Sequence, residues 1–143
     1  MEPILATKNI FTNCSSLDKE SAIINMGTIL YNSGYCTKKY IQGMIEKETV
    51  MNTYIGNGVA IPHGIETMRT EVIKTGLAIS VYPKGIDWGN NNYAYIVIGI
   101  AAIGNEQVNV LSRIAQICID EKNVQKILTY TPEQIGVLFN AAA

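Results

Sequence analysis

The single histidine of the chain, His63, is the residue best placed to do chemistry. It follows the run Val59-Ala60-Ile61-Pro62 and precedes Gly64. The pattern predicts a short buried strand that stops at Pro62, because proline has no N–H for a sheet ladder and fixes its own φ. The imidazole is therefore expected at the edge of a sheet. Gly64 lacks a Cβ, so a backbone or a phosphate could approach the ring closely, and its amide is expected to be free to bind an anion.

A histidine in this position suits phosphoryl transfer, although a simpler interpretation stays open. A neutral imidazole nitrogen is a good nucleophile near pH 7, and a phosphoryl group on that nitrogen remains reactive enough to be passed on. Such transfer needs alignment and positive or donor groups, and in principle no metal or cofactor. The simpler interpretation is a polar residue at a strand end, bonded to a backbone carbonyl, and spacing alone does not decide between the two.

Metal and dinucleotide chemistry are not indicated. One histidine and the dispersed Cys14, Cys36 and Cys118 offer no pair of ligands at zinc-site spacing. Gly56-Asn57-Gly58 lacks the third glycine and the following helix of a dinucleotide loop, and is interpreted as a turn. No metal and no cofactor are expected, and the cysteines are interpreted as reduced packing residues.

Composition bounds the class of protein. With 143 residues, 48% hydrophobic and 16% charged, residues 1–143 are expected to form one folded domain. The net charge of −1 gives no electrostatic case for binding nucleic acid or an anionic membrane. No secretory signal is visible, and the longest apolar run, residues 96–103, is far too short to span a bilayer. The protein is therefore expected to be soluble and cytoplasmic.

The stretch before His63 predicts a short strand and two helices. Residues 8–12 are compatible with the strand. Apolar residues at three-four spacing then predict a helix capped by Ser16 or Asp18 and ended by Gly34 in a left-handed conformation. Thr37 is expected to cap the second helix.

The stretch after His63 predicts two long strands. In residues 75–82, apolar and small or polar residues alternate as in a strand, and Pro83-Lys84-Gly85 is expected to turn the chain. A second turn is expected at residues 89–92. Residues 95–102 form a continuous apolar run, which is typical of a central strand covered on both faces.

Three helices are expected after the central strand. Residues 104–120 predict a heavily buried helix, and a short helix that carries Val124, Ile127 and Leu128 is expected to follow. Thr131-Pro132-Glu133-Gln134 is a capping box that starts the last helix. Helices before and after a group of strands indicate an α/β fold with helices on both faces of the sheet. The face expected to be buried in the first of these helices is Val108, Leu111, Ser112, Ala115, Cys118 and Ile119, widened by Ile114 and Ile117.

A longer signature around His63 resembles a known family. Glu48, Ile55-Gly56 and Val59-Ala60-Ile61-Pro62-His63-Gly64 stand at the spacing of the phosphorylation-site signature of the IIA component of the sugar phosphotransferase system, mannitol/fructose type. Lys74-Thr75-Gly76, Tyr82-Pro83-Lys84-Gly85 and residues 97–106 resemble the mannitol branch in particular. The resemblance spans nearly the whole chain and implies a single α/β domain with a mixed sheet, here a free-standing IIA subunit.

The resemblance also implies a function. His63 would accept a phosphoryl group from the phosphocarrier protein HPr and give it to a cysteine of a cognate EIIB, during uptake of mannitol or a related hexitol or fructose-type sugar. One ring nitrogen would bond a backbone carbonyl while the other takes the phosphate. No direct insertion into the membrane is implied.

Two positions depart from the family pattern. Where the family has an arginine that steadies the phosphate, this chain has Lys47, which keeps the charge but loses the two-pronged fork. Where the mannitol branch has a second histidine, this chain has Gln107, which donates a hydrogen bond but holds no charge.

Each candidate also has a plain structural interpretation. Lys47 would be a solvated lysine at a helix end and Gln107 an ordinary helix N-terminal residue. Glu48 is expected as a surface carboxylate and Trp88 as a core residue.

Two alternatives to a transport phosphocarrier stay open. In the first, a regulatory IIA-like module is phosphorylated by HPr and controls a partner without feeding a transporter, which the residues at positions 47 and 107 would permit. In the second, the chain is a binding domain that carries no phosphate at all.

Overall fold

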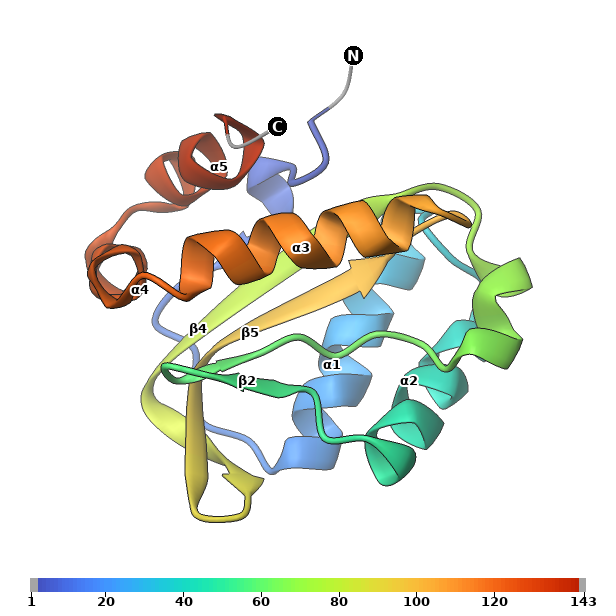
Figure 1. Ribbon diagram of the computed structural model, residues 1–143, viewed down its shortest axis with the longest axis horizontal. Coiled ribbons are helices and arrows are strands. Elements are labelled where there is room, and N and C mark those ends of the chain that lie inside the picture. The colour runs from blue at the N-terminus through green and yellow to red at the C-terminus, as the bar shows by residue number, and fades with distance from the viewer. Residues whose placement is uncertain (1–2, 142–143) are drawn as a thin grey trace.

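A five-stranded mixed β-sheet separates two groups of helices in the computed structural model, which describes residues 3–141 (Figure 1). The strand order is β1-β4-β5-β3-β2. The pairs β1/β4 and β3/β5 are parallel, and β4/β5 and β2/β3 are antiparallel. The expected α/β fold is confirmed, and the apolar run that begins at Tyr95 lies in the central strand. The strands are β1 (Ile10–Phe11), β2 (Tyr54–Gly56), β3 (Val59–Ala60), β4 (Gly76–Gly89) and β5 (Asn92–Ala101).

The helices cover both faces of the sheet (Figure 1). One face packs against α1 and α2, and the other against α3, α4 and α5. Short 3-10 helices lie before β1 and after the His63 segment. The helices are η1 (Thr7–Asn9), α1 (Lys19–Asn32), α2 (Lys39–Val50), η2 (Glu66–Glu71), α3 (Glu106–Cys118), α4 (Glu121–Thr129) and α5 (Pro132–Ala141).

The alternation in β4 divides the core into two layers. Leu77, Ile79 and Val81 pack with residues of α3, α4 and α5, while Ala78 and Tyr82 pack with residues of α1 and α2. All five are buried. Each large side chain that is fully buried contributes about 1.5–3 kcal/mol. A one-residue slip of β4 would exchange its two faces and lose this burial, so the alternation fixes the register of the sheet.

Pro83-Lys84-Gly85 is not the expected turn. The antiparallel pairing passes from Val81 opposite Ile96 to Ile86 opposite Ala94, so residues 82–85 form a bulge within one long strand. Proline is tolerated in a bulge because no ladder N–H is needed there. The chain reverses at the second expected turn, where Asn90 and Asn91 have φ of 55° and 65°.

Several helix boundaries agree with the sequence. The Asp18 carboxylate accepts a hydrogen bond from the Ser21 amide at 2.7 Å, and Gly34 follows α1 with φ of 82°. Thr131 and Gln134 form the reciprocal capping box. The Thr131 backbone amide donates to Gln134 Oε1 at 2.9 Å, and the Gln134 backbone amide donates to Thr131 Oγ1 at 3.2 Å. These caps satisfy backbone groups that a helix end otherwise leaves unpaired.

Two helix predictions are wrong in detail. Thr37 does not cap α2, because its hydroxyl donates instead to the Glu71 carboxylate at 2.5 Å. Val108 in α3 and Ile119 directly after it are 71% and 79% exposed, so the buried face of the helix is shifted from the expected one and keeps only part of it. Apolar residues occur on more than one side of α3, and only one of these sides packs against the sheet. The buried residues are Val110, Ile114, Ile117 and Cys118.

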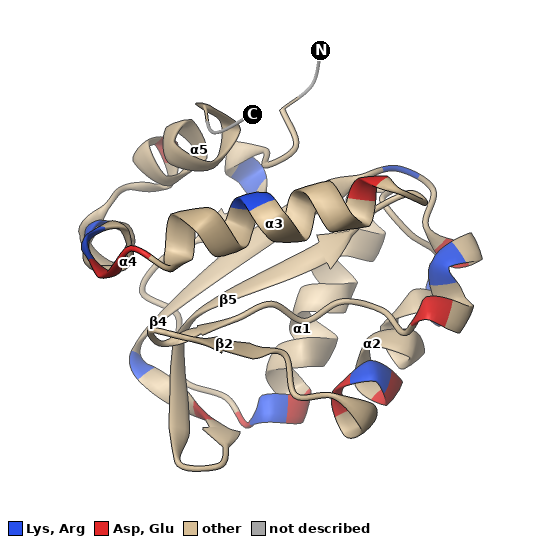
Figure 2. Cartoon of the chain, in the orientation of Figure 1, with Lys and Arg blue, Asp and Glu red and all other residues tan. Residues whose placement is uncertain are grey.

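Charged residues of both signs are interspersed over the described chain without a stripe of one sign (Figure 2). This arrangement agrees with the net charge of −1. Within residues 3–141, no helix combines the length and the apolar character that crossing a bilayer requires.

Candidate functional site

His63 lies just beyond β3, where the parallel strands β3 and β5 approach their carboxyl ends. Its backbone forms a parallel bridge with Ile100 of β5, and the Ile100 amide donates to the Pro62 carbonyl at 3.1 Å. Two residues earlier, the Ile61 amide donates to the Thr53 carbonyl at 3.0 Å, beside β2. The backbone that leads into His63 is therefore held from both sides, at the end of the sheet where α/β proteins commonly place their sites.

The imidazole is held by one nitrogen and open at the other. His63 Nδ1 lies 2.7 Å from the Ile61 carbonyl, and because a carbonyl only accepts, Nδ1 carries the proton. Nε2 has no hydrogen-bond partner among the described residues. Nε2 is also not a fully buried unpaired atom, since Ser80 Oγ is the one such side-chain atom in the part of the chain that the structure describes. The residue is 8% exposed, and with the proton on Nδ1 the lone pair of the neutral ring is on Nε2.

Gly64 is not open to a ligand as the sequence suggested. Its amide donates to the Tyr40 hydroxyl at 2.8 Å, so it is not free for an anion. The close approach that its missing Cβ allows is taken by the ring of Tyr40, since a Cβ on Gly64 would lie 2.2 Å from Tyr40 Cε1. The expected close approach of a backbone or a phosphate is therefore wrong: the neighbour is a side chain of α2, which sequence spacing does not show.

The surroundings of His63 keep its imidazole neutral. Burial lowers the pKa of His63 below the ordinary value of 6.5, and the positive charge of Lys47 lowers it further. The hydrogen bond to Ile61 and the negative charge of Glu48 act in the opposite direction but do not reverse the shift. The uncharged, nucleophilic form therefore persists to lower pH than in a free histidine.

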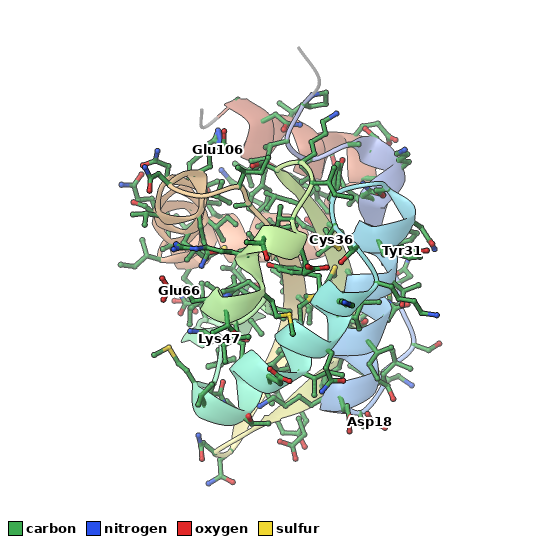
Figure 3. The ribbon with its side chains drawn as sticks, turned by 90° about the vertical axis from the view of Figure 1, so that its right-hand side faces the viewer. Asp18, Tyr31, Cys36, Lys47, Glu66 and Glu106 are labelled. Carbon is green, nitrogen blue, oxygen red and sulfur yellow. The ribbon has the colours of Figure 1, made fainter. Side chains whose placement is uncertain are left out.

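Lys47 is brought to the site by α2. It lies in the last turn of this helix, beside the η2 helix that follows His63 (Figure 3). The Ile65 amide donates to the Gly43 carbonyl of α2 at 2.9 Å, which ties the two segments together. The positive charge of Lys47 lowers the pKa of His63, so this cation acts on the imidazole.

Gln107 lies in the first turn of α3, which follows the carboxyl end of β5. The residue is half-buried, and its backbone amide donates to the Gly104 carbonyl at 3.4 Å. This is the end of the sheet that carries His63. No described contact joins the two side chains, so the role of Gln107 in the site stays a prediction.

Glu48 is not the surface carboxylate that was expected. Its side chain is 6% exposed and accepts hydrogen bonds from the Thr53 amide at 2.9 Å, the Thr53 hydroxyl at 2.7 Å and Trp88 Nε1 at 2.9 Å. Lys19 Nζ lies 3.1 Å away as its ion-pair partner. Trp88 is fully buried, as expected. Glu48 therefore joins the end of α2 to α1, β4 and the segment before β2. In the sequence, only its position at the start of the His63 signature set it apart from a surface glutamate.

Within residues 3–141, no group of three or more histidine, cysteine, aspartate or glutamate side chains could hold a metal ion. The candidate site thus consists of one outward-facing imidazole nitrogen, a nearby lysine and backbone held by buried partners.

Comparison with known proteins decides the family. Residues 3–141 match the family model described as "Phosphoenolpyruvate-dependent sugar phosphotransferase system, EIIA 2". The chain belongs to this family. Its activity is phosphoryl transfer within that system, and the resemblance seen in the His63 signature is confirmed.

Individual relatives of this IIA component point to the mannitol branch. The chain is 40% identical over 138 residues to the mannitol-specific phosphotransferase enzyme IIA component of Bacillus subtilis (strain 168), covering 96% of each chain. It superposes with a TM-score of 0.84 on the crystal structure of IIA mannitol from Escherichia coli, at 33% identity over 93% of this chain and 97% of that one. It also matches a structure of the complex of mannitol enzyme IIA and phosphorylated enzyme IIB from Escherichia coli, with a TM-score of 0.89 at 31% identity over 95% and 96% of the chains.

The depressed pKa of His63 gives a testable pH dependence for this IIA component. We expect phosphoryl acceptance to stay constant as pH falls through 6.5 and to decline only at lower pH, since the neutral ring is the nucleophile. The Lys47→Gln variant should shift the decline to higher pH, because removing a positive charge favours the imidazolium. An NMR titration of the single histidine measures both shifts. A pKa at or above 6.5 in the wild type would contradict the account.

The same shift contributes to stability with a defined sign. The unfolded chain binds the proton near pH 6.5, whereas the folded chain binds it only at lower pH. The free energy of unfolding therefore has its full value above 6.5 and decreases as pH falls through this window.

The Glu48 network of the IIA component should be a large source of stability. We expect Glu48→Ala to lower the free energy of unfolding by about 3 kcal/mol, because three donors and the Lys19 ammonium lose their buried acceptor. Glu46→Ala on the same helix is the matched control and should change it by less than about 0.5 kcal/mol. Urea unfolding measures both values, and equal stability of the two variants would refute the prediction.

Proposed function

We propose that this chain is the IIA component of a mannitol phosphotransferase system and that His63 Nε2 carries the phosphoryl group. The observation that supports this most directly is the imidazole itself, which donates through Nδ1 to the Ile61 carbonyl and leaves Nε2 without a partner among the described residues. The name of the Bacillus relative and the 96% coverage of both chains support mannitol as the sugar. We further propose that residues 1–143 form one IIA domain and that this domain works in the cytoplasm.

Phosphoryl transfer at His63 proceeds in two balanced steps. In the first, the Nε2 lone pair attacks the phosphorus of phosphorylated HPr, and the donor nitrogen leaves with the electrons of its bond to phosphorus. In the second, a cysteine thiolate of EIIB attacks the same phosphorus, and the Nε2–phosphorus bond breaks to return the lone pair to the imidazole. The proton on Nδ1 stays in its hydrogen bond to Ile61 throughout, so the ring needs no change of tautomer.

Lys47 and Gln107 assist this transfer in the proposal. The ammonium of Lys47 offsets the charge on the peripheral phosphoryl oxygens, as loose transition states of this kind require. Gln107, in the first turn of α3, donates a hydrogen bond to the same group. A single ammonium holds phosphate less rigidly than a guanidinium fork, so this clamp is weaker than an arginine would provide.

The partners follow from the same chemistry. HPr supplies the phosphoryl group, and a cognate EIIB receives it. The similarity to the mannitol IIA in the complex with phosphorylated IIB supports the second partner. A regulatory module that is phosphorylated but feeds no transporter is the second candidate, because a lysine and a glutamine replace two groups of the transport branch.

A reconstituted relay tests the proposal. The purified chain is incubated with phosphoenolpyruvate, enzyme I and HPr, and then with a mannitol EIIB. We expect an acid-labile phosphate to form on His63 and to pass to EIIB as soon as EIIB is added. A phosphate that forms on His63 but passes to no sugar-specific EIIB would favour the regulatory candidate. A chain that takes no phosphate at all would refute both.

A further inference from the structure

The Tyr40 hydroxyl joins two backbone groups on either side of the His63 segment. It accepts a hydrogen bond from the Gly64 amide at 2.8 Å and donates one to the Ile100 carbonyl at 2.9 Å. Gly64 follows His63 directly, and Ile100 is the bridge partner of His63 on β5. One side chain of α2 thus ties the loop that leaves the histidine to the central strand of the sheet.

The ring of Tyr40 has no freedom to move away from this position. It is 2% exposed and lies so close to Gly64 that a Cβ there would be 2.2 Å from Cε1 and 2.6 Å from Cζ. Burial raises the pKa of Tyr40 to about 12, so the hydroxyl keeps its proton across the physiological range and remains both donor and acceptor. Without this hydroxyl, the Gly64 amide and the Ile100 carbonyl would each lose a buried partner.

The hydrogen bonds around His63 form one continuous set. The Ile100 amide holds the Pro62 carbonyl, the Ile61 carbonyl holds the imidazole Nδ1, and the Tyr40 hydroxyl holds the Gly64 amide. Tyr40 is the side chain in this set that the signature around His63 does not contain. The direction of Nε2 depends on this backbone, because the ring is fixed through Nδ1 to a carbonyl only two residues away.

We propose that Tyr40 is a positioning residue for phosphoryl transfer: its hydroxyl fixes the peptide that follows His63 and so holds the imidazole with Nδ1 on the Ile61 carbonyl and Nε2 outward. The inference rests on the proposed role of His63 as the phosphoryl acceptor. Because a misplacement of about 1 Å can cost about a hundredfold in rate, loosening this peptide should slow transfer without altering the surface on which a partner protein docks.

Tyr40→Phe tests the inference, with Tyr35→Phe as the matched control. Tyr35 is also buried and packs its ring against a glycine, since a Cβ on Gly76 would lie 2.3 Å from it, and its hydroxyl accepts from Asn9 Nδ2 at 3.4 Å. It lies across β5 from His63, where Gly76 pairs with Ala101. We expect Tyr40→Phe to lower the rate of phosphoryl acceptance at saturating phospho-HPr by about ten- to a hundredfold. The half-saturating HPr concentration should change by less than about twofold, and Tyr35→Phe should leave both quantities near wild type.

Two measurements without any phosphoryl transfer complete the test. In the wild type, the nitrogen NMR spectrum of His63 should show the single Nδ1–H tautomer, and the Gly64 amide should exchange slowly with solvent. In Tyr40→Phe, the tautomers should mix and Gly64 should exchange at least about tenfold faster, while β5 amides remain protected. If the wild type takes no phosphate, the proposed function fails, but these spectra still test whether Tyr40 holds the peptide after His63 and the tautomer of the imidazole. Wild-type rate and spectra in Tyr40→Phe, an equal loss in Tyr35→Phe, or rapid Gly64 exchange in the wild type would each overturn the inference.

Discussion

His63→Ala is expected to abolish phosphorylation of this IIA component by phospho-HPr, with a loss of at least about a thousandfold. No other histidine is present to take the phosphate. The buried thiols do not replace it, because burial raises the pKa of Cys36 to about 11 and that of Cys118 to about 12, which keeps both protonated. The measurement is the acid-labile phosphate bound after incubation with phosphoenolpyruvate, enzyme I and HPr.

The variant should remain folded, which makes the result interpretable. Removing a ring that is 8% exposed and leaving the Ile61 carbonyl without its donor should cost about 2 kcal/mol. Domains of this size commonly have about 5–15 kcal/mol of stability. A circular dichroism melt checks the fold, and binding to EIIB checks the docking surface. Acid-labile labelling retained in folded His63→Ala would place the phosphate elsewhere and end the assignment of the site.

The fold was predictable where local pattern and tertiary structure agree. The alternation from Leu77 to Tyr82 divides the core into two layers because each face of the sheet is covered by helices. The capping box at Thr131 and the left-handed Gly34 are local devices whose partners lie within a few residues. Elements of this kind depend on little beyond their own sequence, so their positions could be read directly from it.

Predictions failed where a residue depends on partners distant in the chain. Pro83 was interpreted as a turn residue, but pairing with β5 on both sides absorbs it in a bulge. Glu48 was interpreted as exposed because its partners Lys19 and Trp88 are each about thirty or more residues away in the chain. The exposed face of α3 was misjudged because apolar residues occur around the helix and only the sheet selects among them.

The candidate site shows the same division. The place of His63 directly after a buried strand and the hydrogen bond from its ring to a backbone carbonyl could be anticipated, because both belong to a contiguous signature. The partner of Gly64 could not, because Tyr40 is twenty-four residues earlier and nothing in the spacing links the two. This hidden contact is the origin of the next prediction.

Gly64→Ala is expected to disable the site although it adds a single methyl group beside His63. The new Cβ would lie 2.2 Å from Tyr40 Cε1, and a buried ring whose hydroxyl is bound at two backbone groups cannot swing aside. The backbone at residues 63–64 must move instead. We expect phosphoryl acceptance to fall by about a hundredfold, because Nε2 is displaced from its alignment, and stability to fall by about 3 kcal/mol from overpacking.

Two other glycines separate this effect from general damage. Gly76→Ala creates a similar clash, 2.3 Å from the ring of Tyr35, on the far side of β5 from His63. Gly136→Ala in α5 meets only ordinary contacts, the nearest at 3.5 Å, and should be neutral or stabilising by up to about 1 kcal/mol. Gly76→Ala should lose stability as Gly64→Ala does, yet accept phosphate within about threefold of the wild-type rate while folded, since its clash leaves the His63 peptide in place. An equal loss of rate in Gly76→Ala would mean that transfer responds to stability alone, whereas a selective loss in Gly64→Ala would tie it to the contact between Tyr40 and the peptide after His63.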